Sequence, residues 1–282
     1  MKNQLKTVLL LGLLTGLLLG AGQLLGGRQG LFIGLAIALV MNFGSYWFSD
    51  KIVLAMYKAK PVKKDHKLYS IVKKVAEKAG MPMPKVYIIP TDNPNAFATG
   101  RNPKHAAVAC TAGILNILDK EELKGVLAHE MGHVKNRDIL ISTIAATIAG
   151  VISYLAFFAR WGAIFGGFGG DRNDGGNLIS LLVLAIITPI IATIIQLAIS
   201  RSREFLADET GAKIMNDPKP LASALKKLEQ SSKMHPLKQT ETSKATAHLF
   251  IVNPFKGKNV MNLFMTHPTT EARVKRLNNM EV

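Results

Sequence analysis

Four long stretches without a charged side chain constrain the fold of this chain more than any other feature. They run over residues 7–25, about 31–48, 139–159 and 178–200. A helix needs about 20 apolar residues to cross the hydrocarbon core of a bilayer, and each stretch is close to that length. A secretory signal would have a shorter apolar core and a cleavage site, whereas the first stretch is long enough to cross the bilayer. We therefore expect four transmembrane helices, arranged as two pairs.

The charges between these stretches predict how the chain is oriented. Residues 51–78 are rich in lysine, and positively charged loops stay on the cytoplasmic side of a membrane. The glycine-rich link 161–177 carries little net charge, which suits the far side. We expect four parts: a transmembrane hairpin at 1–50, a cytosolic part at 51–138, a second helix pair at 139–200, and a second cytosolic part at 201–282. Both termini are then cytoplasmic.

Composition supports this division and indicates the partners of the surface. The chain has 282 residues, of which 48% are hydrophobic, and a formal charge of +16. Its basic residues lie beside the apolar spans and form no recognisable nucleic-acid-binding module. Anionic lipid of the cytoplasmic leaflet is therefore the predicted partner, and nucleic acid is not. Cys110 is the only cysteine, so no intramolecular disulfide can form, and we expect a buried, inert thiol.

The first cytosolic part reads as a small α+β domain. Residues 68–78 carry apolar side chains at helical spacing, and Gly80 ends that helix. Residues 85–89 have the pattern of a strand. Two further strands, 95–100 and 105–110, flank a turn and should form a hairpin. A small β-sheet packed with helices is the expected fold.

The segment His129-Glu130-Met131-Gly132-His133 carries the chemistry. Residues four apart share a helix face, so His129 and His133 can bind one metal ion, while Glu130 is placed to take a proton from water. Zinc suits this role because it lowers the pKa of bound water to about 7. Asp119 and Glu122 are spaced to cap the start of the helix. The motif arises by chance in roughly one chain of this length in a hundred, so further evidence is needed.

A catalytic zinc ion usually has three protein ligands, and the sequence offers several candidates for the third. Glu204 follows the fourth span at about the distance that separates His133 from the third. If the motif helix continued into 139–159, the metal would lie about 10 Å from the bilayer edge. Asp208 lies one turn beyond Glu204, where it can accept the second N–H of a ligating histidine. Alternatively, both acids simply pair with Arg201 and Arg203.

Three other residues remain open as ligands. Asp138 is on the motif helix but should point toward the bilayer, a poor fit to the open side of the ion. His248 and His267 lie on segments whose geometry the sequence does not determine. Zinc content after substitution of each candidate would decide between them.

The combination of His129-Glu130-Met131-Gly132-His133 with residues 202–208 (Ser-Arg-Glu-Phe-Leu-Ala-Asp) and paired spans resembles the HtpX family of membrane zinc metalloproteases. It is similar, more distantly, to the CAAX-prenyl endopeptidases. The likeness includes 95–98 and 247–254. It implies a zincin-like (gluzincin) catalytic domain with one zinc ion per chain and Glu204 as third ligand. It also implies cleavage of misfolded or damaged membrane proteins in the bacterial inner membrane, as part of quality control and the stress response. Other membrane proteases are possible partners.

The resemblance extends to two residues near the C-terminus. In the prenyl-endopeptidase relatives, a histidine and an arginine at the spacing of His267 and Arg273 face the scissile carbonyl. By that similarity these two side chains stabilise the developing oxyanion. The alternative is that Arg273 pairs with Glu271 or another acid, and that His267 caps a turn.

An extended substrate could add beside the strand that begins with Asn95, Ala96, Phe97 and Ala98, since edge strands bind peptides through backbone groups. This completes the predicted site of a metalloendopeptidase.

Three other functions are less consistent with the sequence. An intramembrane zinc protease would carry its motif inside a span, whereas Lys135, Arg137 and Asp138 follow this one. A prenyl-specific protease needs a larger chamber than four spans can build. A membrane scaffold or transporter subunit with a degenerate metal site would have no reason to keep Glu130 beside three ligands.

Overall fold

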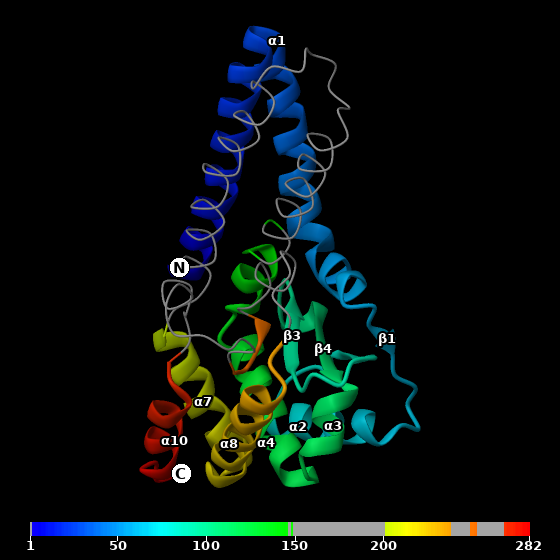
Figure 1. Cartoon of the computed structure of the whole chain (residues 1–282), viewed down its shortest axis with the longest axis vertical. Helices are drawn as coiled ribbons and strands as arrows, with labels where there is room; N and C mark the ends of the chain where they lie inside the picture. The colour runs from blue at the N-terminus through cyan, green and yellow to red at the C-terminus, as the bar shows by residue number, and fades with distance from the viewer. Residues whose placement is uncertain (1, 146–147, 149–200, 238–248, 253–267) are drawn as a thin grey trace.

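The computed structural model describes residues 2–145, 148, 201–237, 249–252 and 268–282. The predicted span 178–200, the link 161–177 and most of 139–159 lie outside these residues. In chain order, the elements are α1 (Lys2–Met56), β1 (Lys60–Pro61), α2 (Lys67–Ala79), β2 (Lys85–Ile89), β3 (Ala96–Gly100), η1 (Pro103–His105), β4 (Ala106–Thr111), α3 (Ala112–Ile117), α4 (Lys120–Lys135), α7 (Arg201–Met215), α8 (Lys219–Met234) and α10 (Thr270–Asn278). In Figure 1, α1 extends from one end of the molecule, and the sheet with its helices forms the other end.

The long element α1 is a helical hairpin. Gly27 has a φ of 54°, a left-handed conformation that glycine adopts without strain, and the two arms of α1 run back along each other from there (Figure 1). Gly22 and Gly30 lie so close that a Cβ on either would collide with the other's carbonyl. Farther along, Asn42 donates a hydrogen bond of 2.8 Å to Thr15 across the two arms. The expected hairpin is therefore present, and its second arm continues to Met56.

The surface of this hairpin is apolar. The arm Gly27–Met56 is the one helix, within the described part of the chain, that is long and apolar enough to cross a membrane. Large hydrophobic side chains on both arms face outward, among them Leu9, Phe32, Val40 and Phe43. A contiguous exposed apolar surface of this kind belongs in lipid rather than water.

The sheet has four strands in the order β1-β2-β4-β3. β2 pairs with β4 in parallel, and β3 pairs with β4 antiparallel, joined by a turn that contains η1. The predicted hairpin of 95–100 and 105–110 is thus confirmed, as is the helix that Gly80 terminates. The short β1 was not predicted. β3 lies at the end of the strand order, and its outer edge faces the site described below, where the Ala98 N–H binds Glu130.

The helix that carries the motif is capped as its sequence predicts. Asp119 accepts hydrogen bonds of 2.9 Å from the N–H groups of Glu121 and Glu122, and Glu122 accepts one from the Asp119 N–H. At its other end, however, α4 stops at Lys135, and Arg137 adopts a φ of 56°. The helix therefore does not continue without interruption into the next apolar stretch, and the depth calculated for a continuing helix does not apply.

The helical residues that follow this break join the hairpin to the sheet. Ile141, Ile144 and Ile148 pack with Leu14 of α1 in a buried cluster. Thr143 lies 3.1 Å from the hydroxyl of Thr99 on β3. The apolar hairpin and the sheet are thus held together by packed contacts.

Candidate metal centre

Close packing of α4 against α7 sets the dimensions of the site. A Cβ on Gly211 of α7 would lie 2.7 Å from the backbone N of His129, and a Cβ on Gly132 of α4 would lie 2.9 Å from the carbonyl of Ala207. Real Cβ atoms essentially never approach so closely, so only glycine allows the two backbones to meet here. This contact brings the side chains of both helices into one small volume.

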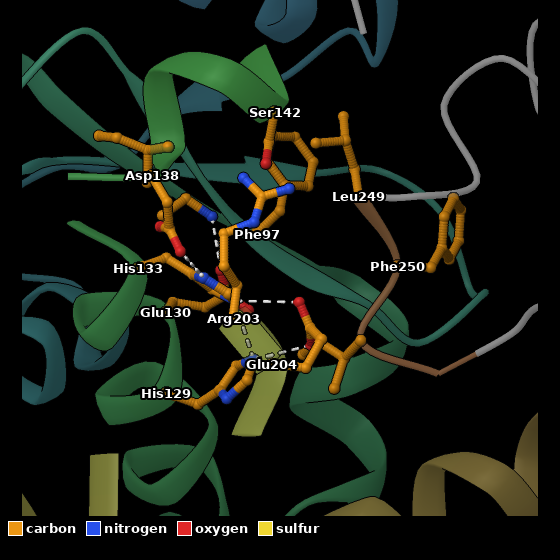
Figure 2. Close-up of a pocket in the computed structure, with 13 residues that line it drawn as sticks. Phe97, His129, Glu130, His133, Asp138, Ser142, Arg203, Glu204, Leu249 and Phe250 are labelled. Carbon is orange, nitrogen blue, oxygen red and sulfur yellow. Dashed lines mark hydrogen bonds and ion pairs between the residues drawn. The ribbon is translucent and has the colours of Figure 1, made fainter. Parts of the chain in front are cut away.

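His129, His133 and Glu204 meet in that volume and could hold a metal ion. The two Nε2 atoms are 3.2 Å apart. Glu204 places one carboxylate oxygen 3.7 Å from His129 Nε2 and the other 3.5 Å from His133 Nε2. Figure 2 shows both imidazoles and the carboxylate turned toward one another from the two helices. Among the described residues, they form the one group of three or more ligand side chains within 4.8 Å.

The first histidine is oriented by an acid and an arginine. Asp208 Oδ1 lies 2.9 Å from His129 Nδ1, as expected from its position one turn after Glu204. Arg273 grips the same carboxylate with two hydrogen bonds of 2.7 and 2.8 Å, a fork that fixes its orientation. Burial raises the pKa of Asp208, but the Arg273 guanidinium outweighs this and holds the pKa well below its ordinary value. Asp208 therefore stays ionised and keeps its oxygen on the histidine.

The second histidine has a partner that the sequence did not reveal. Asp138 Oδ2 lies 3.2 Å from His133 Nδ1, and the Asp138 side chain is buried. The break at Arg137 turns Asp138 back toward the site, whereas a continuous helix would have directed it away. Burial lowers the pKa of His133, but the carboxylates of Asp138 and Glu204 outweigh this and raise it to about 10. Each histidine thus has a carboxylate on its outer nitrogen.

Glu130 is buried beside the two histidines without belonging to the ligand group. The N–H of Ala98 on β3 donates a hydrogen bond of 2.8 Å to its Oε2. Burial raises the pKa of Glu130, and the two histidines and the Ala98 N–H offset part of that rise. A carboxylate with a raised pKa is suited to take and return a proton near neutral pH.

Comparison with known proteins agrees with this geometry. Residues 62–281 match peptidase family M48. The chain belongs to that family. It is 56% identical to a "Protease HtpX homolog" of Desulforapulum autotrophicum over 280 residues, which cover 98% of this chain and 90% of the relative. It is 57% identical to the protein of the same name in Pyrococcus furiosus over 274 residues, which cover 96% and 94%.

A solved structure, Ste24p of S. mikatae, has a similar fold. The TM-score is 0.54 at 17% identity, and the match covers 98% of this chain and 66% of that one. The M48 chain described here is accordingly a membrane-bound metalloprotease. The resemblance inferred from the motifs is confirmed, and a non-catalytic scaffold is not favoured.

A short segment of this M48 protease closes one side of the pocket around the metal group. Asn95 donates a hydrogen bond of 3.1 Å to the carbonyl of Leu249 and accepts one of 3.1 Å from the N–H of Ile251. Arg273 donates another, of 2.8 Å, to the Ile251 carbonyl. We call Leu249–Ile251 the strap. Its side chains line the pocket together with Phe97, Ile139 and residues of the metal group.

The remaining residues of the predicted site lie as follows in the protease. Ala96, Phe97 and Ala98 lie on β3, and Phe97 and Ala98 line the pocket, but the side chain of Asn95 is engaged with the strap. Arg273 pairs with Asp208, one of the alternatives considered for it, and its Nη1 lies 3.6 Å from Glu204. His267 lies outside the described residues. Cys110 is buried and unpaired, and its pKa is raised by that burial, as expected of an inert thiol.

Proposed function

We propose that this M48 protease is a zinc endopeptidase that cleaves misfolded or damaged membrane proteins at the cytoplasmic face of a bacterial inner membrane. The observation that carries the proposal is a buried Glu130 beside the group formed by His129, His133 and Glu204. A base next to three ligands is what metal-assisted peptide hydrolysis requires.

The donor atoms fit zinc in chemistry and spacing. Two imidazole nitrogens and a carboxylate are a common zinc ligand set. Ligands at about 2.0–2.1 Å around a tetrahedral ion would be about 3.3–3.4 Å apart, and the corresponding distances here are 3.2, 3.5 and 3.7 Å. His129, His133 and Glu204 would hold the ion. When bound, zinc polarises the scissile carbonyl and lowers the pKa of water.

The protein's own groups account for the proton transfers and the orientation of the substrate. Glu130 takes a proton from the attacking water and returns it to the leaving amine, as its raised pKa permits. Asp208 and Asp138 hold the two imidazoles in the tautomer that leaves Nε2 free. An extended substrate would lie along the outer edge of β3, between that strand and the metal group.

Four spans, with both termini on the cytoplasmic side, best accommodate the charge pattern and the hairpin. Both ends of α1 point toward the sheet (Figure 1), so one side of the membrane would hold the N-terminus and the site. Lysines after α1 would contact anionic lipid headgroups. Substrates would be membrane proteins whose cytoplasmic segments unfold, a role in quality control and the stress response. Other membrane proteases are possible partners.

The decisive experiment is Glu130→Gln in detergent-purified, full-length protein. We expect this variant to retain zinc at the wild-type level, because Glu130 is not a ligand. We expect it to lose cleavage of β-casein by at least about 100-fold, since general base catalysis contributes 10²–10⁴-fold. Zinc would be measured by atomic emission and cleavage by gel and mass spectrometry on the same preparation.

Two results would count against the proposal. A variant that cleaves β-casein at the wild-type rate would show that Glu130 is not the base. A wild-type protein that binds no zinc, or whose cleavage survives removal of its zinc by a chelator, would show that the metal assignment is wrong.

A further inference from the structure

Arg203 is a cation in the pocket that makes no hydrogen bond to the metal group or to the acids that support it. It directly precedes Glu204 on α7 and lines the same pocket as Glu130 and His133. In Figure 2 its side chain extends toward the side of the pocket on which Phe97 and Ser142 are drawn. Its Nε, Nη1 and Nη2 atoms are all shielded from solvent, and none has a hydrogen-bond partner within the described residues.

The second arginine near the metal group shows how unusual this is. Arg273 is fully buried, and its guanidinium is bound by Asp208 and the carbonyl of Ile251. Arg203 offers the same five donors, and burying them without acceptors is costly for a charged group. A ligand bound in the pocket would supply the missing acceptors.

The acids that face Arg203 are each in contact with a histidine of the metal group. Asp138 and Glu204 act on it through their charges, but neither lies within hydrogen-bond distance of it. Asp138 has one oxygen on His133, and Glu204 faces both histidines. The second oxygen of Asp138 also lacks a partner, so a structural pairing of Arg203 with Asp138 after a side-chain rotation is the competing explanation.

The charge balance indicates what kind of acceptor the pocket takes. With the histidines neutral as ligands, the carboxylates of Glu130, Glu204 and Asp138 are matched by a divalent ion and Arg203, while Asp208 and Arg273 neutralise each other. A free carboxylate would leave this site with an excess negative charge. A neutral backbone carbonyl oxygen would not. The negative charge that it gains as the peptide bond is attacked is balanced by the proton that Glu130 takes from the attacking water.

We propose that Arg203 donates hydrogen bonds to a backbone carbonyl oxygen of the bound peptide beside the metal. This inference rests on the proposed endopeptidase function. It assigns carbonyl recognition to the arginine with unused donors, rather than to Arg273, whose donors are occupied by Asp208 and the strap.

The test uses a peptide that the wild-type protein demonstrably cuts. A β-casein segment spanning a cleavage site found by mass spectrometry would be made with an acetylated N-terminus, an amidated C-terminus and a fluorophore. Its Kd would be measured by anisotropy on full-length, zinc-loaded protein carrying Glu130→Gln. Arg203→Gln, Arg203→Lys and Arg201→Gln would each be added to that background. Arg201 is the matched control, because it is an exposed arginine on the same helix.

We expect Arg203→Gln to weaken peptide binding by about 10- to 100-fold, the usual range for hydrogen bonds to a charged group. Arg203→Lys keeps the charge but loses the planar fork, so its loss should be smaller, about 3- to 10-fold. Arg201→Gln should leave the Kd unchanged. If Arg203→Gln does not retain zinc, the Kd of Arg203→Lys decides instead, and its expected loss is the one given above.

Three outcomes would overturn the inference. One is an unchanged Kd at matched zinc content, together with a lower melting temperature, as a structural pairing with Asp138 predicts. For the second, the same peptide is made with a free C-terminal carboxylate. If Arg203→Gln weakens the binding of this peptide but not of the amidated one, the site is that of an exopeptidase. For the third, Arg203→Ala is made in protein that keeps Glu130, and millimolar guanidinium fails to restore any of its cleavage. If the wild-type protein itself cleaves no β-casein, the proposed function is contradicted instead.

Discussion

Arg273 is the residue whose surroundings differ most from the role that similarity suggested for it. Its guanidinium donates hydrogen bonds to Asp208 and to the strap, and its Nη1 lies 3.6 Å from Glu204. In this arrangement it contacts the metal group through Asp208, which orients His129, and also directly, since its Nη2 lies 3.4 Å from both ring nitrogens of His129. The spacing between His267 and Arg273 indicated that Arg273 lies near the site. Spacing alone could not indicate which group the Arg273 side chain binds.

At the same scale, the third ligand can be separated from its supporting acid. We expect Glu204→Ala to lose zinc affinity by far more than Asp208→Ala, because Glu204 belongs to the ligand group and Asp208 reaches the metal only through His129. Loss of such a supporting partner typically costs about 10- to 100-fold in affinity. Zinc retained during titration with a graded chelator is the measurement, on protein whose folding is verified by its melting temperature.

Asp138→Ala is the matched comparison for that titration, since Asp138 supports His133 as Asp208 supports His129. Its effect should fall in the same range as that of Asp208→Ala. Wild-type zinc retention by Glu204→Ala, with loss in Asp208→Ala, would show that the ligand set is mistaken.

At the scale of elements, the α4–α7 contact determines whether the site exists. Gly211→Ala would place a methyl group against the backbone of His129, so the helices must separate. Overpacking of this kind costs about 1–3 kcal/mol of stability, and here it should also reduce zinc affinity. Gly44→Ala is the control, since a Cβ there meets no atom within 4 Å.

Thermal unfolding and zinc content would be compared for both variants. A Gly211→Ala protein with wild-type melting temperature and zinc content would show that the helices can approach without a glycine at this position.

The elements were predictable from the sequence to the extent that local patterns determine them. The capping box at Asp119 and Glu122, the β-hairpin and the ligand spacing all follow from residues near each other in the chain. The break at Arg137 was missed because nothing in the pattern requires a non-glycine residue with positive φ. Asp138 was therefore directed away from the site in the prediction. The binding of the strap by Asn95 depends on a contact between distant segments, which a single sequence does not show.

At the scale of the whole molecule, the hairpin and the charge pattern together predict one orientation in the membrane. With Cys110 replaced by serine, a cysteine at Arg28, at the exposed tip of α1, should react with an impermeant maleimide on intact bacterial cells. A cysteine at Lys64 should react only after lysis, because lysine-rich loops remain in the cytoplasm.

Labelling after lysis controls for accessibility at both positions. Reaction of the Lys64 cysteine on intact cells, with the Arg28 cysteine protected, would invert the topology.

The metal group with its support is assembled from parts of the chain that are synthesised far apart in time. His129 and His133 leave the ribosome first, Glu204 follows only after the stretch 139–200, and Arg273 comes almost last. Because Asp208 and the strap are both bound by Arg273, a nascent chain cannot complete this network until α10 has emerged. The metal ligands can therefore be present in the chain before the arginine that holds Asp208 and the strap in place has been made.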